Sequence, residues 1–135
     1  MLALILGVAG IGVVLFNQRP AHEDDLAIPV GELRSQGFEL RLLNAAAARG
    51  RDRRFVTAHA RQLAQSIERA RDELASLQPV PALTAVQGEA LRRSVSLADA
   101  AAQLGAGRAP LAPPLVAEIV ATAERLKALE SALKR

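Results

Sequence analysis

The chain has no cysteine, no tryptophan and no tyrosine, and only three phenylalanines among its 135 residues. Without cysteine it forms no disulfide and offers no thiolate to zinc or to an iron–sulfur cluster. The shortage of aromatic residues disfavours β-sheets, whereas the abundant alanine and leucine favour helices. A chain of this length forms one domain of ordinary size. We therefore expect an all-α protein.

The chain also lacks a large excess of either basic or acidic residues. The chain has 17 basic and 14 acidic residues, which leave a net charge of only +3. A nucleic-acid surface needs clustered Lys and Arg together with aromatic side chains that stack on bases, and the aromatic side chains are nearly absent. We do not expect a nucleic-acid partner.

The two histidines, His22 and His59, lack the neighbours that metal binding or catalysis requires. Neither of them follows a glutamate by three residues, which is the pattern of di-metal sites in helical bundles. The sequence also contains no G-x-S-x-G, no P-loop and no G-x-G-x-x-G. We therefore expect no catalytic, cofactor or metal site, and a protein that is not an enzyme.

The longest run without charge is the amino-terminal segment 1–16, which the polar residues Asn17, Gln18 and Arg19 end. Sixteen helical residues span about 24 Å, somewhat less than the roughly 30 Å hydrocarbon core of a bilayer. We predict a transmembrane anchor over residues 1–18. Its expected lipid contacts are Leu2, Leu4, Ile5, Leu6, Val8, Ile11, Val13, Val14, Leu15 and Phe16.

A cleaved signal peptide and a buried core helix are the alternatives for this segment. No basic residue precedes the apolar run, as a signal peptide requires, and its three glycines suit a membrane helix better than a helix in water. Arg19 is the only base beside the run and favours a cytoplasmic bundle. If the natural chain starts upstream with a basic segment, the bundle instead lies outside, which is the usual arrangement for an uncleaved amino-terminal anchor. We expect a single-pass protein of a bacterial-type cytoplasmic membrane with a periplasmic bundle, and the opposite orientation stays open.

Beyond the anchor, the sequence predicts a linker over residues 19–28 and four helices over residues 29–135. The second helix, expected over residues 53–78, is the clearest, because its apolar residues alternate at spacings of four and three, the heptad pattern of coiled coils. Asp52 is its expected N-cap. The heptad positions are Val56, Ala60, Leu63, Ile67, Ala70, Leu74 and Leu77.

The bounds of the other three helices are predicted from residues that typically begin or end a helix. The first is expected over residues 29–49, with two glycines that weaken it. The third is expected to open on a capping box between Thr84 and Gln87, and the fourth has Pro114 at its first position. Because the predicted loops are short, we expect an up-down antiparallel four-helix bundle.

Four arginines lie within six residues at the expected turn between the first two helices of the bundle: Arg49, Arg51, Arg53 and Arg54. Only Asp52 opposes them. Guanidinium groups bind phosphate and carboxylate through paired hydrogen bonds. We predict that this turn contacts anionic lipid head groups or an acidic partner, and an ordinary solvated turn is the alternative.

Two functions fit this organisation. The first is a membrane-anchored interaction protein, an accessory or assembly subunit of a larger membrane complex. The second is an extracytoplasmic bundle that senses or carries a small molecule, and it needs an interior cavity with polar groups from Gln87, Ser94 and Thr122. A second copy of the chain is a further expected partner for exposed apolar surface. In architecture alone the plan is similar to the extracytoplasmic sensing domains of bacterial chemoreceptors, and this likeness carries over no binding residue.

Overall fold

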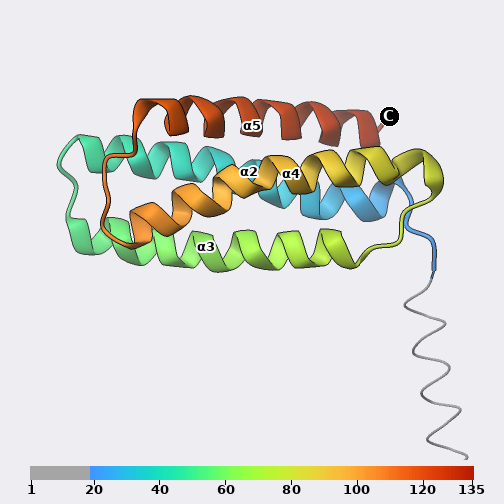
Figure 1. Cartoon of the computed structure of the whole chain (residues 1–135), viewed down its shortest axis with the longest axis horizontal. Coiled ribbons are helices and arrows are strands. Elements are labelled where there is room, and N and C mark those ends of the chain that lie inside the picture. The colour runs from blue at the N-terminus through green and yellow to red at the C-terminus, as the bar shows by residue number, and fades with distance from the viewer. Residues whose placement is uncertain (1–18) are drawn as a thin grey trace, which may run out of the picture.

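The computed structural model describes residues 19–135, and this part of the chain folds into four α-helices packed side by side (Figure 1). The helices are α2 (Glu23–Ala48), α3 (Arg53–Ser76), α4 (Thr84–Gly105) and α5 (Pro113–Leu133), and a short turn η1 (Pro81–Leu83) precedes α4. Successive helices run in opposite directions (Figure 1). The predicted all-α four-helix bundle is therefore confirmed.

The predicted transmembrane anchor, residues 1–18, lies outside the described residues. Within residues 19–135, no helix is long and apolar enough to cross a membrane. The chain enters the bundle beside the loop that joins α3 to α4, because Ala21 N donates to Gln78 O and Val80 N donates to Ala21 O. Ala21 is itself buried. These contacts fix the point from which residues 1–18 lead away.

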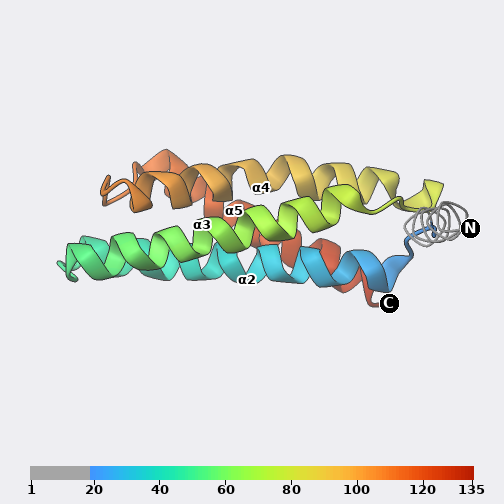
Figure 2. The same cartoon turned by 90° about the horizontal axis from the view of Figure 1, so that it is seen from below.

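Each helix contributes a stripe of apolar side chains to one shared core. In α3 the first six of the seven predicted heptad positions are buried, and Leu77 is half-buried. Asp52 caps this helix as predicted, since its Oδ1 accepts from Arg54 N at 2.8 Å. The helices follow one another around the core, because α2 packs against α3 and α5, and α4 packs against α3 and α5 (Figures 1 and 2).

The first helix of the bundle begins at Glu23, six residues before the expected start at Pro29, so most of the predicted linker 19–28 is helical. Three acidic residues in the first turn stabilise the positive end of the helix dipole. One of them, Asp25, accepts a hydrogen bond from His22 N at 2.9 Å. Pro29 lies inside the helix and is buried, and its nitrogen cannot donate the hydrogen bond that other residues give to the carbonyl four residues earlier.

The two glycines of α2 mark its closest approach to α5. A Cβ atom at Gly37 would lie 3.1 Å from Ala123 Cβ, and one at Gly31 would lie 2.9 Å from Glu130 Oε1. A larger residue at Gly31 would displace the end of the Glu130 side chain, and one at Gly37 would crowd Ala123 and Leu97. The sequence shows these glycines only as weak helix formers, whereas the structure shows that they lie where side chains of α4 and α5 come close to α2.

The predicted capping box at the start of α4 is wrong. Thr84 lies inside the helix, Leu83 is the N-cap, and no side chain caps this end. Gln87 instead reaches across to the carboxyl end of α3, where its Nε2 donates to Leu74 O at 2.9 Å and to Leu77 O at 2.8 Å. Leu74 O also accepts from Leu77 N, whereas Leu77 O lies at the C-cap and is bonded by Gln87, so Gln87 joins the two helices.

Replacing Gln87 by Ala is therefore expected to lower the free energy of unfolding by about 1–2 kcal/mol, because it removes two part-buried hydrogen bonds between helices and leaves Leu77 O without its donor. Replacing Thr84 by Ala is the matched control and should change stability by less than about 0.5 kcal/mol. Urea unfolding of both variants measures the difference. A larger loss from Thr84→Ala than from Gln87→Ala would restore the capping box and contradict the cross-helix contact.

Candidate functional site

The four arginines predicted as a contact site all lie exposed at the turn between α2 and α3. This turn is at the end of the bundle opposite to the one where the chain enters from residues 1–18 (Figure 1). The length of α2, 26 residues, separates the two ends by about 39 Å. The structure thus brings the four residues together at one end.

The side chain of Arg53 has a structural contact. Its Nη2 donates to Gly107 O at 3.2 Å, and Arg61 Nε donates to Gly105 O at 3.2 Å. Both acceptors lie at or just beyond the carboxyl end of α4, where helix carbonyls lack partners and cations are favoured by the helix dipole. Arg53 therefore ties the α2–α3 turn to the α4–α5 loop.

The other three arginines of the turn are less engaged by the bundle than Arg53. The guanidinium of Arg51 lies 4.5 Å from the centre of the Phe55 ring, which holds it by a cation–π contact. Within residues 19–135, the side chains of Arg49 and Arg54 make no hydrogen bond or ion pair. The acidic neighbour Asp52 is engaged in capping α3. The guanidinium groups of Arg49, Arg51 and Arg54 are therefore accessible to an anion from outside the chain.

A cleft of about 230 Å³ separates the turn from the α4–α5 loop, and Arg51 and Arg53 line it together with Thr57 and Gly107. The exposed Arg108 follows Gly107 directly, so it joins the same end of the bundle. We call Arg49, Arg51, Arg53, Arg54 and Arg108 the arginine cap. Sequence reasoning missed Arg108, because only the fold brings position 107 to Arg53 across 54 residues of chain.

The three polar residues expected for an interior ligand site are occupied by contacts within the bundle. Ser94 is fully buried and bonds Arg71 Nε and Leu91 O, each at 2.8 Å. Thr122 bonds Ser96 at 3.2 Å, which joins α4 to α5. Gln87 caps α3. None of these three residues lines the arginine-cap cleft, the small hollow beside Gly50, or the groove beside α2.

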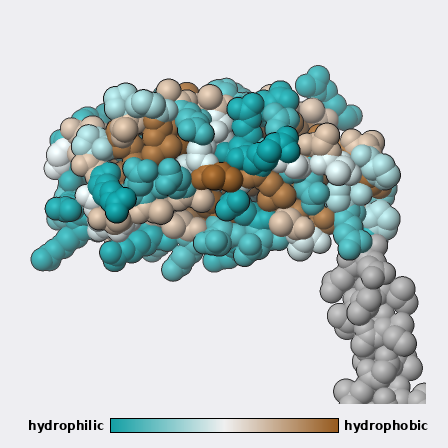
Figure 3. All heavy atoms as spheres, in the orientation of Figure 1, coloured by the Kyte–Doolittle hydropathy of each residue, from teal (hydrophilic) through white to brown (hydrophobic). Residues whose placement is uncertain are grey.

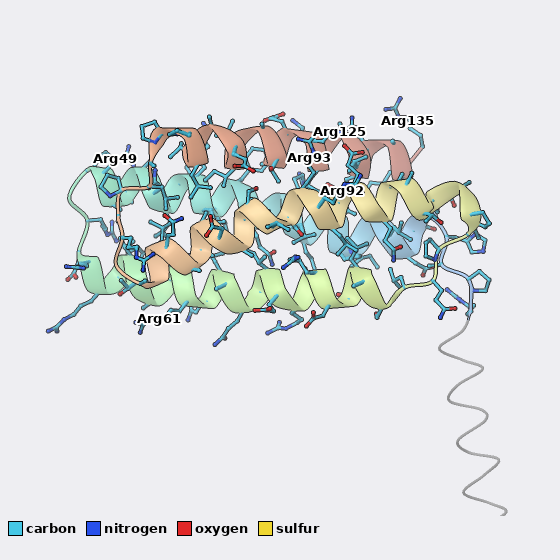
Figure 4. The ribbon with its side chains drawn as sticks, viewed as in Figure 1. Arg49, Arg61, Arg92, Arg93, Arg125 and Arg135 are labelled. Atoms are coloured by element: carbon cyan, nitrogen blue, oxygen red, sulfur yellow. The ribbon has the colours of Figure 1, made fainter. Side chains whose placement is uncertain are left out.

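A second group of charges lies between α4 and α5, on a face that mixes hydrophilic and apolar side chains (Figures 3 and 4). Arg125 binds Glu89 through both carboxylate oxygens, with Nη2 to Oε2 at 3.0 Å, and Arg93 Nε lies 3.8 Å from Oε1. The hydrogen bonds from Arg125 are the main reason that the pKa of Glu89 lies below its ordinary value. This contact ties the two helices together at the surface.

The lowered pKa predicts a loss of stability in acid. The unfolded chain binds a proton at Glu89 more readily than the folded chain, so stability from this contact is present above about pH 4.5 and is lost as the pH falls through the lower folded pKa. We expect Arg125→Met to weaken this pH dependence. Urea midpoints at neutral pH and at low pH measure it, with Arg69→Met, an exposed arginine on α3, as the control. An unchanged pH dependence in Arg125→Met would contradict the assignment.

In the part of the chain that the structure describes, no three His, Cys, Asp or Glu side chains gather as metal ligands. The arginine cap with its cleft, and the groove beside α2, are two candidate binding surfaces of the described residues. Comparisons with protein-family models, with curated proteins and with solved structures give no match to this chain, so these surfaces carry the functional argument.

Proposed function

We propose that the chain is a single-pass membrane protein, anchored by residues 1–18, whose bundle binds another protein as an accessory or assembly subunit of a membrane complex. We place the bundle outside the cytoplasmic membrane, as is usual for an uncleaved amino-terminal anchor. We propose a binding role and not a catalytic one.

The hydrogen bonds made by the interior polar residues support this proposal. The sensing or carrier alternative needs Ser94, Thr122 and Gln87 to face a ligand, but their hydrogen bonds join helices to one another. Meanwhile large apolar side chains remain on the outside, with Ile28 60% and Leu42 64% exposed. Because the interior polar residues are engaged within the bundle, we favour a binding role at the surface, where Ile28 and Leu42 are accessible to a partner.

The position of the arginine cap favours an acidic protein over lipid. The cap lies at the end of the bundle remote from residue 19, about 39 Å along α2. Attraction between exposed charges fades over roughly 8–10 Å at physiological ionic strength. The head groups around the anchor of an upright bundle would therefore lie beyond the reach of the cap, whereas an acidic surface of a larger subunit could meet it.

Replacing Arg49, Arg51, Arg54 and Arg108 by Gln tests this assignment without removing the structural contact of Arg53. Full-length protein is purified from solubilised membranes at low and at high salt, and the co-purifying protein is quantified. We expect several-fold less partner for the variant at low salt and a smaller difference at high salt, because screening weakens the same contacts in the parent. Equal recovery at both salt concentrations would exclude the cap from the interface.

A further inference from the structure

A groove of about 620 Å³ runs along α2, with the carboxyl-terminal part of α5 on its other side. Its lining carries four carboxylates against two cations: Asp24, Glu32, Glu39 and Glu130 against Arg34 and Lys134. The groove is therefore acidic, although the whole chain has a net charge of +3. Its charge is opposite to that of the arginine cap.

The floor of this groove has an unsatisfied hydrogen-bond acceptor. Glu130 is buried over Gly31 and pairs with Arg34, whose Nε lies 2.7 Å from Glu130 Oε2, and with Lys134. Gln36 also lines the groove and is only 9% exposed, and among residues 19–135 its Oε1 has no hydrogen-bond partner. A buried acceptor without a donor is unfavourable, and this oxygen is enclosed by the bundle beneath the groove.

The exposed apolar side chains of α2 continue the groove along the helix. Ile28, Ser35 and Leu42 are seven residues apart and so share one face of α2. Figure 2 shows α2 along the lower edge of the bundle, with the carboxyl end of α5 beside its amino-terminal end. The exposed Glu32 and Glu39 lie between Ile28 and Leu42 along the helix, so this side of α2 carries both acidic and apolar side chains. Ile28 and Leu42 lie about 21 Å apart, the length of about 14 helical residues.

We propose that this groove and the stripe of Ile28, Ser35 and Leu42 bind one basic amphipathic helix of a partner protein. Apolar residues of that helix pack on Ile28 and Leu42, and its flanking Lys or Arg side chains pair with Glu32 and Glu39. This is the helix-in-groove mode of recognition. The inference rests on the proposed function, since it names the surface that holds the partner.

A second copy of the chain fits this surface poorly because of its charges. Antiparallel pairing centred on Ser35 would set Glu32 of one copy beside Phe38 and so near Glu39 of the other, and parallel pairing would set each glutamate against itself. Like charges facing each other across an interface are destabilising. A basic helix removes this repulsion, which is why we assign the groove to a different protein.

Binding of a synthetic peptide tests the proposed helix recognition directly. The probe is an 18-residue amphipathic helix with a leucine stripe flanked by Lys and Arg, compared with the same peptide carrying Glu at the basic positions. Fluorescence anisotropy with the full-length protein in detergent should show binding of the basic peptide only. Glu32→Lys/Glu39→Lys and Ile28→Ser/Leu42→Ser should each weaken it about tenfold or more. Glu68→Lys/Glu73→Lys, on the exposed face of α3, should change it less than about twofold.

Other results would overturn the assignment. Equal binding of both peptides, or equal loss in the α3 control, would show a non-specific interaction. Binding of the amine spermidine, but not of the peptide, would assign the groove to a small cation. The amount of partner that co-purifies from membranes distinguishes failure of the groove assignment from failure of the proposed function. If the groove variants retain that partner, the groove assignment fails and the proposed function stands, whereas a parent protein without any partner contradicts both.

Discussion

Replacing Leu97 by Ala is expected to lower the free energy of unfolding by about 2–5 kcal/mol, which is a large part of the stability of a small domain. Leu97 lies in α4 and is fully buried. Its Cδ2 fills the space above Gly37 of α2, where a Cβ atom would lie 3.4 Å away. Neither Gly37 nor its neighbour Ala123 has a side chain that can move into the cavity. We therefore expect a value in the upper part of this range.

Urea unfolding of the full-length protein, followed by far-ultraviolet circular dichroism, measures the loss. Val95→Ala is the matched control, because Val95 lies in the same helix but is 54% exposed, and it should cost less than about 0.5 kcal/mol. Similar losses for Leu97 and Val95 would contradict the packing of α4 against α2.

Placing two arginines in the predicted anchor, Leu6→Arg with Val13→Arg, is expected to release the protein from the membrane. An arginine at the centre of a membrane helix costs about 2.5–3.5 kcal/mol on the insertion scale, and each substitution also removes an apolar side chain. A total of about 5–7 kcal/mol would exceed what a short apolar run gains by inserting.

Washing membranes with alkaline carbonate and measuring the protein left in the pellet tests this prediction. The parent should stay in the pellet and the double variant should appear in the supernatant. Gln18→Arg is the control and should behave like the parent, because position 18 is expected at the polar edge of the span. Release of the parent by the same wash would contradict the anchor.

The periodic features of the fold were predictable from the sequence. The heptad seam of α3 and its Asp52 cap depend only on residues within one helix, and local patterns of this kind indicate which side chains face the core. The start of α5 at its two prolines follows from the same local chemistry. The position of the four arginines at one turn follows from the order of the helices.

The features that the sequence did not show depend on contacts between helices. Gln87 has the spacing of a capping box with Thr84, but its amide reaches α3, which no pattern within α4 records. Pro29 resembled a helix start because proline is common there, yet the three acidic residues before it begin the helix earlier. Arg108 and the groove of α2 and α5 arise from segments distant in sequence.

Native mass spectrometry of the full-length protein, extracted gently from its own membrane, tests the central claim most directly. We predict a particle that contains this chain and at least one different polypeptide in fixed stoichiometry, with the assembly weakened by Glu32→Lys/Glu39→Lys. A chain that is found alone, or paired only with itself, and that carries the extra mass of a small molecule would contradict the account and favour a sensing or carrier bundle.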